Sequence, residues 1–520
     1  MSRSLAKSTS VVGGMTLLSR VMGFLRDIVF ARFFGASMGM DVFVVAFQIP
    51  NFLRRLFGEG AFSQAFVPVL TEYEKQREHE QVQDLADRVA GTLGLILFII
   101  TVLGVIAAPA LILLFAPGFA EQADKYSLAT QMLRMTFPYL LFISLTAFAG
   151  GILNTYGRFG VPAFTPVLLN LVLIASVFWL APHFERPMLG LAAGVFIAGI
   201  VQLTFQLPFL KQLKLLPRPR WGWKHEGVRK IMRLMLPAIF GSSVAQINLI
   251  IDRVIASFLA TGSISWLYYS DRLLEFPLGV FAIALATVIL PGLSRHHASQ
   301  SPDAFSRTLD WALRLALVIA TPAAVGMFVL AGPMIATLFN YGAFGAGDVR
   351  MASYSLMAYS FGLMAFTMVK ILAPGYFARQ DTRTPVKVSV IAMLTNIVLN
   401  LLIVLPMLWL DLPAPHAGLA LATGLAAALN AFLLYRGLRR LDVYRPGDGW
   451  AWIASRVLLA NVVMGGLLWW LAGGVGEWLE LVWYQRALRL GLCIAGGLVS
   501  YLAVLLLTGV RVRHLAARLA

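Results

Sequence analysis

The chain has 520 residues, of which 59% are hydrophobic and only 13% are charged, and its mean hydropathy is +0.78. These values exclude an ordinary soluble domain and are typical of a polytopic helical membrane protein. The single cysteine, Cys493, excludes a disulfide framework and a thiolate metal site. A net charge of +17 raises the alternative of nucleic-acid binding. The basic residues lie in short loops beside apolar segments, however, which favours a membrane surface and no nucleic acid.

Apolar stretches of about 20 residues predict about fourteen transmembrane helices. Their approximate cores are 11–34, 41–70, 89–116, 128–152, 161–181, 188–209, 231–260, 265–293, 309–339, 351–376, 385–410, 416–435, 450–473 and 487–508. The first is interpreted as a retained helix, because no small-residue cleavage site follows the short basic N-terminus. Prolines within spans, such as Pro50, Pro68 and Pro138, are expected to break or kink helices. Irregular backbone at membrane depth is tolerated where it lines protein or a cavity.

Charge asymmetry between the loops predicts the orientation. Most of the 42 Lys and Arg fall in the N-terminal tail, in every second loop and in the C-terminal tail. The opposite loops hold Lys125, Arg186, Arg350 and Arg486. The positive-inside rule therefore predicts cytoplasmic N- and C-termini. The densest basic run, 211–230, includes Trp221 and Trp223 and is interpreted as a basic amphipathic cytoplasmic linker on the inner leaflet.

The linker separates six spans from six. At one constant offset, Gly39, Pro68 and Pro162 in the first half fall on Gly262, Pro291 and Pro385 in the second. This similarity favours a transporter built from parallel repeats around a central site. The predicted organisation is an N-lobe (1–210), the linker (211–230), a C-lobe (231–440) and a C-terminal helix pair (441–520) outside the duplication.

Arginines inside or against the apolar stretches point to function. They are Arg20, Arg26, Arg54, Arg55 and Arg272. Each would cost roughly 2.5–3.5 kcal/mol at a helix centre, so such residues usually face a water-filled cavity. The guanidinium fork pairs well with phosphate or carboxylate oxygens. The alternative is that an arginine near a helix end extends its side chain to the membrane–water interface. This alternative is preferred for Arg32 and Arg134.

No motif supports an enzyme. The chain has no GxxxxGK[ST] loop for ATP, no HExxH and no recognisable catalytic triad. The expected protein is an ATP-independent carrier that needs no cofactor.

Long stretches resemble a known family. Residues 16–36, 41–73, 152–164, 263–281 and 372–387 are similar to the MurJ (MviN) family of bacterial lipid II flippases. That family belongs to the multidrug/oligosaccharidyl-lipid/polysaccharide exporter superfamily. The resemblance implies an all-α fold with two six-helix lobes around a V-shaped cavity. It also implies that two C-terminal helices, 450–473 and 487–508, form a groove for the undecaprenyl tail.

The resemblance also implies a function and a site. The substrate would be lipid II, an undecaprenyl-pyrophosphate-linked disaccharide-pentapeptide, moved by alternating access from the cytoplasmic to the periplasmic leaflet of the inner membrane for cell-wall synthesis. Substrate-binding residues would be Arg26, Arg54 and Arg272 with Arg20, Arg55 and Ser19. Supporting or gate positions would be Asp41, Glu59, Ser265, Asp271 and Glu275, with the small residues Gly39 and Gly262 letting the lobes meet. Gln48 stands where the family pattern has Lys. The positive charge expected on this side of the cavity is therefore undecided.

The driving force is open at this stage. The alternatives are the membrane potential, an ion gradient such as that of Na⁺, and the gradient of the substrate itself. Asp252, with Asp381, Thr395 or Asn396, would supply oxygen ligands for a cation. The alternative is that Asp252 pairs with Arg253 or bonds Asn248. Expected partners are lipid II, membrane lipids and cell-wall synthesis proteins, with the chain itself a monomer. Two other functions are a related drug or polysaccharide-lipid exporter and a non-transporting scaffold for cell-wall assembly.

Overall fold

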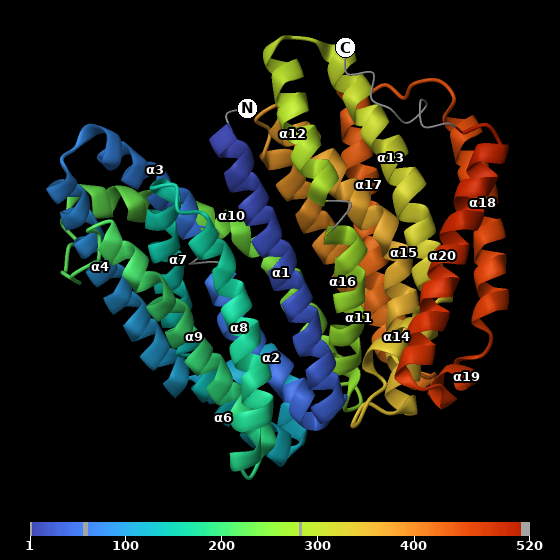
Figure 1. Ribbon diagram of the computed structural model, residues 1–520, viewed down its shortest axis with the longest axis horizontal. Coiled ribbons are helices and arrows are strands. Elements are labelled where there is room, and N and C mark those ends of the chain that lie inside the picture. The colour runs from blue at the N-terminus through green and yellow to red at the C-terminus, as the bar shows by residue number, and fades with distance from the viewer. Residues whose placement is uncertain (1–2, 56–60, 280–282, 511–520) are drawn as a thin grey trace. The chain divides into compact units, whose positions relative to one another are not determined.

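The computed structural model describes residues 3–55, 61–279 and 283–510, and these form helices and turns without a strand (Figure 1). Contacts divide the chain into a first unit, Met1–Gly262, and a second unit, Ser263–Ala520. Ten helical stretches in the described part are long and apolar enough to cross a membrane. The predicted all-α polytopic class is therefore confirmed, and the protein is a multi-pass membrane protein.

The described helices of the first unit pack against one another. They are α1 (Arg3–Phe34), α2 (Met38–Arg54), α3 (Ala61–Gln76), α4 (His79–Ile106), α5 (Ala108–Phe115), η2 (Pro117–Glu121), α6 (Ala123–Thr136), α7 (Tyr139–Thr155), α8 (Gly160–Trp179), η3 (Ala181–His183), α9 (Pro187–Gln212) and α10 (Glu226–Ala256). α8 packs on α1 and on α9, and α10 packs on α3. Small residues make the close approaches: a Cβ on Gly194 of α9 would lie 2.2 Å from Ser176 Oγ of α8.

The second unit is organised around α13, α15 and α17. Its helices are α11 (Ser263–Pro277), α12 (Ile283–Ala298), α13 (Pro302–Val329), α14 (Ala331–Phe339), α15 (Ala346–Phe377), α16 (Arg383–Trp409), α17 (Pro415–Arg440), α18 (Trp450–Ala472), α19 (Val475–Glu480) and α20 (Trp483–Leu507). The backbones of α15 and α17 nearly touch, because a Cβ on Gly362 would lie 2.8 Å from Gly424 Cα. A core that includes Leu309, Tyr376 and Leu438 joins α13 to both helices.

Most of the predicted spans fall on described helices, and several are divided, whereas spans 41–70 and 265–293 include residues outside the described part. Span 89–116 overlaps α4 and α5, span 128–152 overlaps α6 and α7, and span 309–339 overlaps α13 and α14. Pro138 lies at the α6–α7 break, as expected for a residue that lacks an N–H donor. Pro50, by contrast, lies within the continuous helix α2.

The 211–230 linker is not a separate helix. α9 continues to Gln212 and α10 begins at Glu226, so the backbone between them is irregular. It is fastened to α4, where Asp87 Oδ1 accepts a 2.8 Å hydrogen bond from the Arg218 backbone N–H. Because the contacts divide after Gly262, α10 falls in the first unit. The lobe boundaries expected from the sequence stay a prediction.

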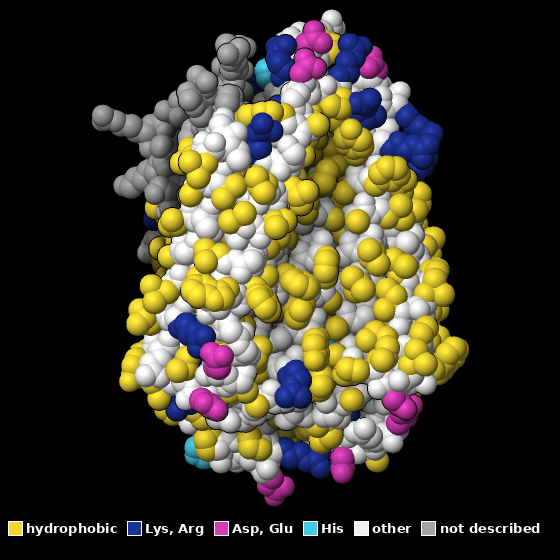
Figure 2. Space-filling view, turned by 90° about the vertical axis from the view of Figure 1, so that its right-hand side faces the viewer, with side chains coloured by type: hydrophobic (Ala, Val, Ile, Leu, Met, Phe, Trp, Pro, Cys, Tyr) yellow, Lys and Arg dark blue, Asp and Glu magenta, His cyan; other side chains and the backbone are white. Residues whose placement is uncertain are grey.

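One face of the second unit has the surface of a membrane-embedded wall. Figure 2 shows hydrophobic side chains over the middle of this face, with charged side chains gathered toward its two ends. Exposed apolar residues on α18 and α20 include Trp469, Trp470, Leu488 and Leu507. Hydrocarbon is the environment that such a surface requires.

Candidate functional site

Arg26 of α1 is a buried cation with a complete set of polar contacts. Its Nε and NH2 donate to Asp27 Oδ1 at 3.0 and 2.7 Å, and its guanidinium lies 5.5 Å from the centre of the Phe30 ring. Arg26 is 7% exposed and Asp27 only 1%. Adjacent residues on a helix ordinarily point apart, so a third group must orient the arginine.

That third group is Asn170 of α8, which the sequence reasoning missed. Its Oδ1 accepts from Arg26 NH1 at 3.0 Å, and its Nδ2 donates to the Ser19 carbonyl at 3.2 Å. Asn170 thereby fixes the guanidinium and the backbone of α1 together. A single amide within an apolar run, 166-PVLLNLVLIAS-176, was the available signal, because a buried amide needs hydrogen-bond partners.

The other predicted arginines of the first unit are less enclosed. Arg54 is half-buried and donates from Nε to Asn51 Oδ1 of its own helix at 3.1 Å. Arg20 and Arg55 are exposed. Glu59, the acid expected beside Arg54, lies outside the described residues. Arg26 is therefore the most enclosed of these arginines, and Arg54 is half-buried beside Asn51 of its own helix.

Arg272 of the second unit has an open environment. Its NH1 donates to Glu275 Oε2 at 2.9 Å, and the two side chains are 35% and 52% exposed. The guanidinium also lies 4.9 Å from the centre of the Tyr268 ring. Ser265 of the same helix is buried, and Asp271 is half-buried. An exposed ion pair is weak, so an anionic ligand can replace Glu275 at little cost.

Asp41 is the centre of a second buried ion pair. Its Oδ2 accepts from the Gly262 N–H at 2.8 Å and lies 3.5 Å from Lys125 Nζ. The ammonium group is 4.5 Å from the centre of the Phe119 ring. The sequence placed Lys125 in an outer loop, but it lies in the first turn of α6 and is 3% exposed. Only the packing of α6 on α2 reveals it as the partner of Asp41.

Gly118 contacts the C-terminal end of α10, where Ser257 follows the last helical residue. The Gly118 N–H donates to Ser257 Oγ at 3.0 Å, and a Cβ at Gly118 would lie 2.4 Å from the Ser257 carbonyl oxygen. Gly262 has φ +100°, a conformation that suits glycine. Gly39 also allows close packing, since its Cβ would lie 2.6 Å from Met188 Cγ.

Two of the alternative cation ligands predicted in the second unit, Asp381 and Asn396, lie far apart. Asp381 accepts from the Thr384 N–H at 3.0 Å at the start of α16, and hydrogen bonds from Thr384 lower the pKa of this carboxyl group. Asn396 is fully buried farther along the same helix, about 22 Å away at ~1.5 Å rise per residue, and Thr395 beside it is half-buried. One ion therefore cannot bind Asp381 together with Asn396. Asp252 is half-buried on α10 of the first unit. Within the described residues, no group of three or more His, Cys, Asp or Glu can hold a metal.

Two glycines of the C-terminal helices, Gly465 and Gly497, allow close packing. A Cβ at Gly497 of α20 would lie 2.9 Å from Leu468 Cδ2 of α18, and one at Gly465 would lie 3.2 Å from Val325 Cγ1 of α13. Gly466 faces open space. The groove predicted for the polyprenyl tail stays a prediction.

Comparison with known proteins decides the family. Residues 30–484 match the family model described as "Lipid II flippase MurJ". The chain belongs to the MurJ family. It is 51% identical to the "Probable lipid II flippase MurJ" of Vibrio cholerae, over 99% of this chain and 98% of that one. It is 48% identical to the protein of the same description from Haemophilus influenzae, over 97% of this chain and 100% of that one. The resemblance seen in the sequence is confirmed.

Solved structures agree with this assignment. The structure titled "Lipid II flippase MurJ, inward closed conformation" is 27% identical, with a TM-score of 0.78 over 95% of this chain and 97% of that one. An inward-facing multidrug resistance MATE transporter of the MOP superfamily is 14% identical, with a TM-score of 0.65 over 83% of this chain and 97% of that one. The second match shows a shared fold alone.

Proposed function

We propose that this chain is a lipid II flippase that moves its substrate from the cytoplasmic to the periplasmic leaflet of the inner membrane, with both termini in the cytoplasm. The observation that carries the proposal is the buried, fully oriented Arg26 in a chain of the MurJ family. A fixed guanidinium inside an apolar bundle suits the pyrophosphate of a lipid-linked precursor. A cationic drug would find no such advantage there.

The environments of Arg26 and Arg272 support different roles for the two residues in substrate binding. Arg26 is preorganised by Asp27 and Asn170, so it loses little side-chain entropy when an anion arrives. Arg272 exchanges its exposed Glu275 partner for the substrate. Each of these arginines thereby offers N–H donors to the pyrophosphate or to a peptide carboxylate of the substrate. Arg54 at the end of α2 is the third proposed ligand of the anionic head group.

The membrane potential is the driving force that the charge of the substrate favours. Lipid II is an anion, and its outward movement follows a potential that is negative inside. Each elementary charge that crosses 100 mV contributes about 2.3 kcal/mol. This contribution explains how a carrier without an ATP-binding motif can sustain net transport.

Two assays test the proposal. Depletion of the protein in cells should lower the amount of lipid II accessible at the outer face of the inner membrane. Purified protein in vesicles should translocate labelled lipid II faster under a negative-inside potential than without one. Unchanged accessibility after depletion, together with no translocation in vesicles, would reject the function.

A further inference from the structure

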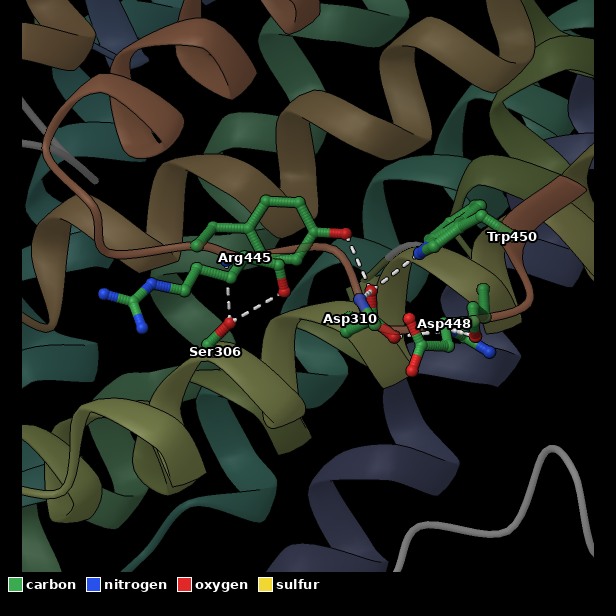
Figure 3. Close-up of polar contacts among 8 residues, drawn as sticks. Ser306, Asp310, Arg445, Asp448 and Trp450 are labelled. Atoms are coloured by element: carbon green, nitrogen blue, oxygen red, sulfur yellow. Dashed lines mark hydrogen bonds and ion pairs between the residues drawn. The ribbon is translucent and has the colours of Figure 1, made fainter.

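The C-terminal helices α18 and α20, with α19 between them, are here called the terminal pair. They pack on α13 and α14 of the second unit. At one end, Asp310 of α13 accepts hydrogen bonds through Oδ1 from Tyr444 Oη at 2.8 Å, Trp450 Nε1 at 2.7 Å and the Gly447 N–H at 3.1 Å (Figure 3). Its Oδ2 accepts from Arg314 Nε at 2.7 Å. A single carboxylate that is 8% exposed thus joins α13 to the segment that leads into α18.

Further hydrogen bonds join α13 to the same segment, residues 444–450. Ser306 Oγ accepts from the Arg445 N–H at 2.9 Å, and Arg314 NH2 donates to the Asp448 carbonyl at 2.8 Å (Figure 3). Burial, with the bond to Asp310, raises the pKa of the Tyr444 phenol. The phenol therefore stays protonated and keeps donating.

In the middle of the helices, a proline creates a second attachment. Pro322 of α13 has no N–H, so the Val318 carbonyl one turn earlier loses its helical donor. Tyr501 of α20 is 2% exposed and donates to that carbonyl at 2.7 Å. Beside it, Asn461 Nδ2 of α18 donates to Thr321 Oγ1 of α13 at 3.0 Å. Both helices of the terminal pair are thereby bonded to the stretch of α13 that proline opens.

At the other end, a buried arginine makes the third attachment. Arg486 of α20 donates from NH1 to the carbonyls of Ala336 and Asn340 at 3.1 and 3.0 Å, and from NH2 to that of Leu479 at 2.9 Å. The first two carbonyls end α14, where helical donors are absent and the dipole is negative. Arg486 is 7% exposed.

We infer that the terminal pair is fixed on α13 and α14 throughout transport, and that substrate never passes between α13 and α18. The inference rests on the proposed function, because its test measures lipid II translocation. Separation of the helices would remove three donors from the Asp310 carboxylate, which keeps only Arg314, and both α14 carbonyls from Arg486, which keeps only Leu479. The Val318 carbonyl would lose the Tyr501 donor and be left unpartnered. Unpartnered groups of this kind are strongly unfavourable, so a cycle that opened this interface at each turnover would face a high barrier.

Disulfide crosslinks test the inference. In a Cys493→Ala background, Gly332→Cys with Val475→Cys links α14 to α19, because the Gly332 Cβ position lies 3.5 Å from Val475 Cβ. This separation matches that of natural disulfides. A second pair, Val325→Cys with Gly465→Cys, links α13 to α18 and keeps the test open if the first variant fails to fold.

Lipid II translocation is measured in vesicles for each oxidised variant, for the same preparation after reduction, and for the four single-cysteine controls. The expected result is that quantitative crosslinking changes the rate less than twofold. Loss of transport on oxidation that reductant restores would overturn the inference. The active reduced form would at the same time leave the proposed function intact.

Discussion

Replacement of Arg26 by alanine would separate its structural role from its functional role, provided that Asp27 is changed in parallel. In Arg26→Ala, the Asp27 carboxylate stays 1% exposed and loses both contacts from the guanidinium. Removal of one partner from a buried ion pair destabilises a protein by about 3–5 kcal/mol. The single variant should therefore unfold at a clearly lower temperature and should also fail to transport lipid II.

The double variant Arg26→Gln/Asp27→Asn removes both charges and keeps a polar amide at each position. We expect its thermal stability to return close to that of the wild type, because no buried charge is left unpaired. Transport should nevertheless fall by at least about tenfold, since a charge-assisted hydrogen bond to the substrate contributes about 1.5–3 kcal/mol. Arg26→Lys should rescue transport only in part, because an ammonium group cannot serve Asp27 and Asn170 with the same planar fork.

The measurements are thermal unfolding in detergent by intrinsic fluorescence and lipid II translocation in vesicles. Wild-type transport by the neutral double variant would refute the role of Arg26 as a substrate ligand. Wild-type stability of Arg26→Ala would refute the argument from buried charge.

Two further perturbations address the contacts that hold the end of α10. Lys125→Met should lower both thermal stability and transport, because it leaves the buried Asp41 carboxylate without its cation; equal stability of variant and wild type would contradict this. Gly118→Ala should reduce the yield of folded protein, since its Cβ would lie 2.4 Å from the Ser257 carbonyl oxygen. The matched control is Gly94→Ala, where nothing lies within 4 Å of the added Cβ, and size-exclusion profiles that are identical for the two variants would count against the steric argument.

Hydropathy and charge, read along the sequence, determined the class of this protein. Whether a stretch is apolar enough for hydrocarbon depends on its own composition, so the apolar helices could be predicted without contacts. The family followed from the resemblance of long stretches to a known family. That Arg26 needs a polar environment followed from its apolar neighbours. The sequence predicted a side chain that faces a water-filled cavity, however, and its burial against Asp27 and Asn170 was seen only in the structure.

Only the tertiary structure decided which partners these groups have. Asn170 approaches Arg26 because α8 packs on α1, and Lys125 reaches Asp41 because α6 packs on α2. Periodicity along one helix carries no information about such meetings between distant segments. The Val318 carbonyl is another example. Pro322, which removes its helical donor, is visible in the sequence, but Tyr501 of α20 becomes its donor only when the helices pack. Local chemistry therefore specified which groups needed partners, and packing specified which residues supplied them.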